Sequence, residues 1–167
     1  IANGEGVIPD EKYRLLWGGG LPSWFALSDF NYFNSKGAVF PAETTYRTFE
    51  NTRLFDIDLT KINDPLEHIA WRWIKYWTFW YDAARKRPGS HPDVEKLIQY
   101  IEDYDIDGVV MHEAFSCRTW HPGLIWQLNQ LKKVYRDIPS LVLESDIVDI
   151  SSYSEVDTHA RIDAFIE

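Results

Sequence analysis

The feature of this sequence that most restricts its fold is an alternation of short apolar runs with longer amphipathic segments. The apolar runs lie at residues 13–17, 38–40, 107–112 and 140–144, and they are rich in Val and Leu. Segments with helical spacing separate them, which is typical of a parallel sheet covered on both faces. Right-handed crossovers leave few topologies for such a sheet. We therefore predict four parallel strands in the order 2-1-3-4.

Local start signals place the helices between these strands. The residues that open the predicted helices are Pro22, Asp64 with Pro65, His91 with Pro92, Pro122 and Ser154. Asp and Ser are favoured N-caps, and Pro is favoured in the first helical turn. The first of these helices is expected to end at residues 36–37. The prediction is an α/β fold of the small doubly wound, Rossmann-like (flavodoxin-like) type, with helices on both faces of the sheet.

Length and charge narrow the class of protein further. The 167 residues suit one domain. We expect a disordered leader at residues 1–12 and a single α/β domain at residues 13–167. We interpret this domain as the C-terminal domain of a longer subunit. The net charge of -9 argues against a nucleic-acid partner, and no apolar run is long enough for a membrane span. One cysteine excludes an internal disulfide and fits a reducing, cytoplasmic location.

Unusual residues collect where the predicted strands end. Ligands of doubly wound sheets sit beyond the carboxyl ends of the strands. The segments expected there are Gly18–Gly20, Pro41–Tyr46, Glu113–Trp120 and Glu144–Asp149. The glycines fit a tight turn better than a phosphate cradle, because they lack the spacing of a nucleotide-binding loop. The carboxylates fit loop capping better than acid–base chemistry.

Cys117 is the most chemically distinctive residue at this edge. A thiolate is both a nucleophile and a soft-metal ligand. The residues alone leave open an inert thiol, a Cys–His nucleophile, or a zinc site built from His112, Cys117 and His121. The sequence therefore singles out Cys117 without fixing its chemistry.

Several stretches resemble the C-terminal domain of the benzoyl-CoA reductase/2-hydroxyacyl-CoA dehydratase family. They are DGVVMH at 107–112, SCR at 116–118, IPSLVLESD at 138–146 and RIDAFIE at 161–167. The resemblance implies subunits with tandem Rossmann-like domains, in which two homologous subunits together hold a 4Fe-4S cluster beside an acyl-CoA. It also implies low-potential electrons from an ATP-dependent iron–sulfur activator protein in an anaerobic metabolism.

The resemblance also assigns residues. By the S-C motif, Cys117 would be one cluster ligand, with the other ligands in the upstream domains of the same subunit, so the isolated domain is expected to be inactive. The residues expected around the cluster or substrate are Ser116, Arg118, His121, Gly19, Glu144 and Asp146.

Three classes of function remain open at this point. Aromatic residues at 71–80 and Trp120 favour a benzoyl-CoA reductase-type enzyme, which reduces an aromatic acyl-CoA. The alternative within the same family is a 2-hydroxyacyl-CoA dehydratase, which eliminates water through a ketyl radical. A rival of another class is a non-catalytic domain that docks through its Trp-rich helix. A cysteine-dependent hydrolase is the third possibility.

Overall fold

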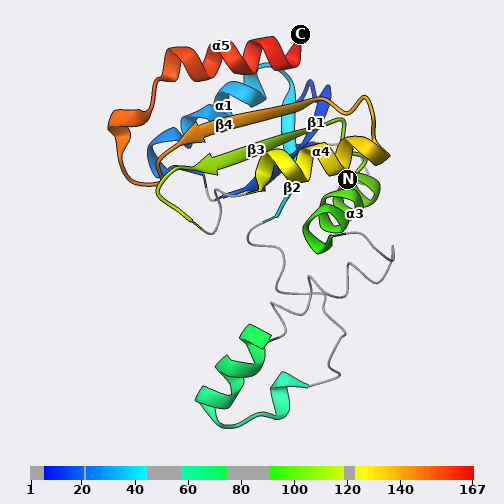
Figure 1. Cartoon of the computed structure of the whole chain (residues 1–167), viewed down its shortest axis with the longest axis vertical. Coiled ribbons are helices and arrows are strands. Elements are labelled where there is room, and N and C mark those ends of the chain that lie inside the picture. The colour runs from blue at the N-terminus through cyan, green and yellow to red at the C-terminus, as the bar shows by residue number, and fades with distance from the viewer. Residues whose placement is uncertain (1–5, 21, 45–57, 75–90, 119–122) are drawn as a thin grey trace.

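The computed structural model describes residues 6–20, 22–44, 58–74, 91–118 and 123–167. Its centre is a four-stranded parallel sheet (Figure 1). The strands are β1 (Tyr13–Gly19), β2 (Ala38–Glu43), β3 (Gly108–Ala114) and β4 (Ser140–Ser145). Their order is β2-β1-β3-β4 and every neighbouring pair is parallel, which confirms the predicted topology.

Helices cover both faces of this sheet. The α-helices with complete bounds are α1 (Ser28–Ser35), α3 (Pro92–Tyr104), α4 (Leu124–Val134) and α5 (Glu155–Ile166), and residues 65–74 are also helical. Short 3-10 turns are η1 (Trp24–Ala26), η3 (Leu59–Lys61) and η4 (Ile150–Ser152). In Figure 1, α1 and α5 lie on one face and α3 and α4 on the other, as expected for a doubly wound sheet.

Each face of the sheet has its own apolar core. Successive side chains of a strand point to opposite faces, so one strand feeds both cores. In β1, Leu16 packs with the α3 and α4 side, whereas Leu15 and Trp17 pack with the α1 and α5 side. In β3, Met111 and Val110 are divided in the same way, and both are fully buried. This double burial explains why the strands read as continuous apolar runs.

Several boundaries differ from the sequence prediction. Strands β1 and β3 each continue two residues past their predicted ends at Trp17 and His112. Helix α1 begins at Ser28 after η1, later than the predicted start at Pro22. Ser23 would be a natural cap, but its hydroxyl makes no capping bond and donates instead to the carbonyl of Asp146. Strand β2 continues through Pro41 to Glu43, because β2 is an edge strand and tolerates a residue without a backbone N–H.

Several predicted caps are confirmed. Asp64 Oδ1 accepts hydrogen bonds from the backbone N–H groups of Leu66 and Glu67, at 2.8 and 3.0 Å. His91 caps α3 and Ser154 caps α5 through their side chains. Trp77, Trp80, Trp120 and Pro122 lie outside the described residues, as do residues 1–5 of the predicted leader. No helix in the described part of the chain is long and apolar enough to cross a membrane.

Candidate functional site at the carboxyl edge of the sheet

The carboxyl ends of β1, β3 and β4 lie side by side. Gly19 is in register with His112, and Ala114 is in register with Ser145. The backbone N–H of Gly20 continues the pairing by donating to the carbonyl of His112 at 2.9 Å. The loops that follow these strands therefore start from one edge, where the sequence predicted the site.

The glycines at the end of β1 allow close packing against β3. Gly19 has a φ of +79°, and a Cβ on it would lie 2.5 Å from the carbonyl oxygen of His112. A Cβ on Gly18 would collide with the Met111 sulfur. These contacts explain Gly18 and Gly19 as residues that bring two strands together. Both belong to β1 and pair with β3, so the predicted tight turn does not begin at Gly18.

Cys117 lies in the turn that directly follows β3. Its backbone N–H donates to the carbonyl of Ala114 at 3.1 Å, which closes the turn. The residue is partly exposed, and its neighbours Ser116 and Arg118 are exposed. Cys117 is thus a partly exposed residue at the predicted edge and belongs to neither apolar core. His121 lies outside the described residues.

Asp146 is the polar centre of the loop after β4. Its Oδ1 accepts hydrogen bonds from the backbone N–H groups of Val148 and Asp149, at 2.7 and 2.9 Å. A hydrogen bond from the Ser116 hydroxyl, together with these N–H groups, lowers the pKa of Asp146 to about 2. The structure therefore brings Ser116 and Asp146 together, beside Cys117. Glu144 is exposed and lies opposite Glu113 of β3.

A buried polar chain, which the sequence analysis missed, lies beneath this loop. His112 Nε2 is 2.7 Å from Ser145 Oγ, and Ser145 Oγ is 2.7 Å from Ser23 Oγ. Ser23 Oγ donates to the carbonyl of Asp146 at 2.5 Å. All three side chains are at most 5% exposed. The only sign of this chain in the sequence is Ser145, a serine in place of an apolar residue at the end of β4. A single serine does not indicate which residues it bonds to.

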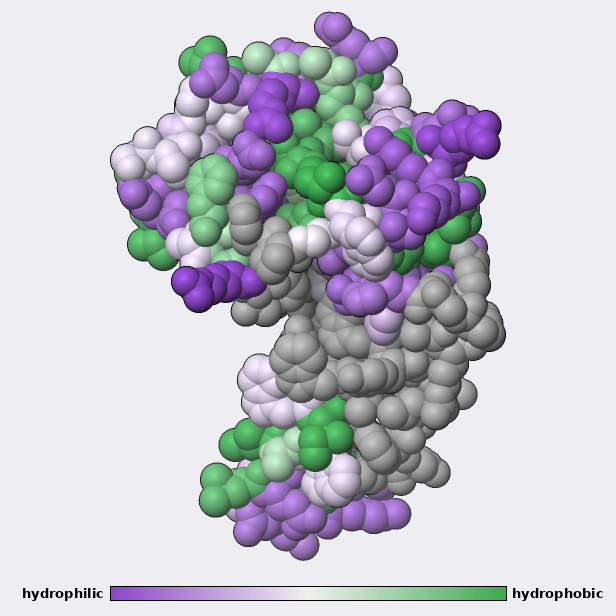
Figure 2. All heavy atoms as spheres, in the orientation of Figure 1, coloured by the Kyte–Doolittle hydropathy of each residue, from purple (hydrophilic) through white to green (hydrophobic). Residues whose placement is uncertain are grey.

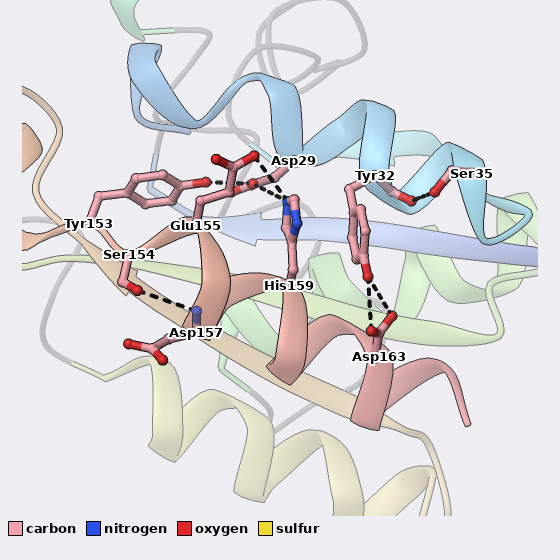
Figure 3. A network of polar contacts seen from close by, with 9 residues as sticks. All are labelled: Asp29, Tyr32, Ser35, Tyr153, Ser154, Glu155, Asp157, His159 and Asp163. Carbon is pink, nitrogen blue, oxygen red and sulfur yellow. Dashed lines mark hydrogen bonds and ion pairs between the residues drawn. The ribbon is translucent and has the colours of Figure 1, made fainter.

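A second polar cluster joins α1 to α5 (Figure 3). The hydroxyl of Tyr153 donates to Asp29 Oδ1 at 2.6 Å, and His159 Nε2 lies 3.3 Å from the same oxygen. Burial raises the pKa of Asp29 despite these partners. The His159 ring stacks on Tyr32 with the ring centroids 3.6 Å apart.

The two clusters meet at a small cavity. It has a volume of about 20 Å³, and the polar residues that line it include Ser23, Asp29, His112, Ser145 and Tyr153. A space of this size holds about one water molecule. This volume is too small for a substrate.

The metal-binding capacity of this edge is limited. No group of three His, Cys, Asp or Glu residues that could hold a metal ion occurs among the residues that the structure describes. In the zinc alternative, His112 Nε2 already contacts Ser145 and His121 is not described. A single thiolate at a partly exposed turn fits one ligand of an iron–sulfur cluster whose other ligands come from elsewhere.

Comparison with known proteins agrees with this architecture. The family model described as "2-hydroxyglutaryl-CoA dehydratase, D-component" matches residues 1–167. The chain is also 26% identical over 165 residues to a subunit of benzoyl-CoA reductase from Thauera aromatica, a match that covers 98% of this chain and 35% of that protein. The chain thus spans about a third of the length of this curated relative. It belongs to the benzoyl-CoA reductase/2-hydroxyacyl-CoA dehydratase family.

Proposed function

We propose that this chain is the C-terminal domain of a subunit of a benzoyl-CoA reductase-type enzyme and that Cys117 is one ligand of its 4Fe-4S cluster. The observation that carries the proposal is the position of the thiol. It is partly exposed in the turn after β3, at the edge where a doubly wound sheet binds its ligands. The remaining ligands are assigned to the upstream domains of the same subunit.

The residues around the thiol suit this role. A 4Fe-4S cluster, when bound, supplies single electrons at a potential set by burial and by hydrogen bonds near its sulfurs. The hydroxyl of Ser116, which directly precedes Cys117, helps to lower the pKa of Asp146. Such an interaction orients the turn that carries the ligand, in the way that outer residues orient metal ligands. Arg118 is exposed in the same turn and is available to an anionic part of an acyl-CoA.

Two related reactions are compatible with the family. The likeness to the benzoyl-CoA reductase of Thauera aromatica supports reduction of an aromatic acyl-CoA. The family description supports the alternative, loss of water from a 2-hydroxyacyl-CoA. In both cases the partners are a homologous second subunit and an ATP-dependent iron–sulfur activator. An anaerobic assay of the intact complex with benzoyl-CoA and with 2-hydroxyacyl-CoA thioesters separates the two reactions.

The ligand assignment is tested by Cys117→Ala in the full-length protein, purified without oxygen. We expect loss of cluster absorbance, of iron and of activity. The matched control is Phe115→Leu, which changes an exposed side chain in the same turn without removing a donor atom. Unchanged iron content in Cys117→Ala would exclude Cys117 as a ligand.

A second candidate function is docking without catalysis, through the helical segment at residues 65–74. Apolar side chains of this segment are exposed, with Leu66 at 76% and Trp73 at 54%, and Figure 2 shows green spheres over it at the bottom of the view. The partner would be the homologous second subunit. Leu66→Ser combined with Ile69→Ser would then separate the two subunits in size-exclusion chromatography. A complex that stays intact would count against docking at this segment.

A further inference from the structure

The buried chain of His112, Ser145 and Ser23 has a direction that follows from counting hydrogens. A carbonyl oxygen only accepts, so the single hydroxyl hydrogen of Ser23 is used on Asp146. The short contact between the two serines then requires Ser145 to donate to Ser23. Since the hydrogen of Ser145 is used there, Ser145 accepts from His112, and His112 Nε2 must carry a hydrogen.

This direction has a chemical consequence. A serine nucleophile must give its hydrogen to the neighbouring imidazole, which acts as the general base. Here the imidazole donates and the serine hydrogen points away, toward Ser23. The Ser145–His112 pair, buried at 5% and 2% exposure, is therefore arranged for structural hydrogen bonding and not for hydrolysis.

The chain also connects three separate parts of the carboxyl edge. His112 belongs to β3, Ser145 ends β4, and Ser23 lies in the loop between β1 and α1. The backbone N–H of Phe115 donates to the carbonyl of Ser145 at 3.3 Å, so the Cys117 turn is tied to the same residue. Beyond Ser23 the chain reaches the backbone of Asp146, and the Ser116 hydroxyl is among the groups that lower the pKa of the Asp146 carboxylate.

We propose that His112, Ser145 and Ser23 are positioning residues that fix the turn carrying Cys117 through a directional hydrogen-bond chain. Their role toward a cluster rests on the function proposed above, whereas their role in holding the turn does not. In a buried chain, removal of one member takes one hydrogen bond away from each of its neighbours. The turn should then move more freely, and the Cys117 thiol should become more reactive.

The test measures alkylation of Cys117 by iodoacetamide in the metal-free full-length protein, followed by peptide mass spectrometry. We expect Ser145→Ala and His112→Leu to raise the alkylation rate by about tenfold. His112→Gln should stay near the native rate, because the Gln amide nitrogen can donate to Ser145. The matched control is Ser35→Ala, which removes an exposed hydroxyl that donates to the carbonyl of Tyr32. Equal rates in Ser145→Ala and Ser35→Ala would overturn the proposal.

Two further measurements separate this proposal from the cluster assignment. In ¹⁵N spectra of the protein, the His112 ring should show a bonded hydrogen at Nε2, and a ring with its hydrogen only on Nδ1 would overturn the direction of the chain. In the loaded protein, loss of iron to a chelator should be about tenfold faster in Ser145→Ala than in Ser35→Ala. If Cys117→Ala keeps its iron, the cluster assignment fails, and the alkylation rates and ring spectra still decide the positioning role.

Discussion

Replacement of Gly19 with Ala tests whether this glycine is required by the approach of β1 to β3. A left-handed backbone costs an ordinary residue about 1–2 kcal/mol. The new Cβ would also lie 2.5 Å from the carbonyl oxygen of His112 and 3.1 Å from Leu124 Cδ1. Because a strand backbone cannot rotate away as a side chain can, overpacking adds about 1–3 kcal/mol. We expect Gly19→Ala to lower the free energy of unfolding by about 2–5 kcal/mol in total.

Gly123→Ala is the matched control for this experiment. Gly123 has a φ of +100°, and no atom of the described residues lies within 4 Å of a Cβ built on it. This variant should therefore show only the backbone cost, about 1–2 kcal/mol. Both variants reduce the entropy of the unfolded chain equally, so that contribution cancels between them.

Urea unfolding followed by tryptophan fluorescence measures both changes, provided that the slope against urea concentration is the same in all proteins. The difference between the two variants, about 1–3 kcal/mol, reports the contact with β3 alone. Equal losses of stability in Gly19→Ala and Gly123→Ala would refute the close-packing explanation of the glycine turn.

Three other perturbations test the cores and the charges. Burial lowers the pKa of Lys96 to about 7, so between pH 7 and 10.5 the unfolded chain binds a proton that the folded protein does not. The free energy of unfolding should therefore rise across this pH range. Lys96→Met should remove the rise, as measured by urea titrations from pH 7 to 10.5. Phe33→Ala removes a fully buried ring and should cost about 3–5 kcal/mol by thermal or urea unfolding, against less than about 1 kcal/mol for the exposed Phe115→Ala. The pKa of Asp146 is lowered from 3.8 to about 2, so the stabilisation from this carboxylate is present above pH 3.8 and is lost as the pH falls toward 2. In Asp146→Asn, the free energy of unfolding should therefore fall less steeply between about pH 4 and 2, and an unchanged slope would contradict the assigned hydrogen bonds.

The fold was largely predictable because its signals are local or follow from general topology. Parallel strands that are buried on both faces give continuous apolar runs, and the handedness of crossovers restricts their order. The prediction failed where a distant partner changed a local preference. Ser23 was available as a helix cap, but its hydroxyl bonds to the carbonyl of Asp146, 123 residues along the chain, and α1 begins later.

Some residues of the candidate site could be predicted from the sequence, and others could not. Cys117, Ser116 and Asp146 were predicted at the carboxyl edge because each follows an apolar run, and the structure places them there. Whether Cys117 binds iron stays a prediction. Asp29, Tyr153 and His159 were not anticipated, since each occurs in an ordinary amphipathic or loop context.

By itself, the sequence determined an alternating α/β chain, a thiol at the end of its third strand, and membership of a recognisable family. Only the tertiary structure decided that His112 donates to a serine 33 residues away and that this serine bonds to another 122 residues away. The physical reason is that apolar periodicity reports which face of an element is buried. A hydrogen bond depends instead on distances and directions between atoms that come together only when the sheet has formed.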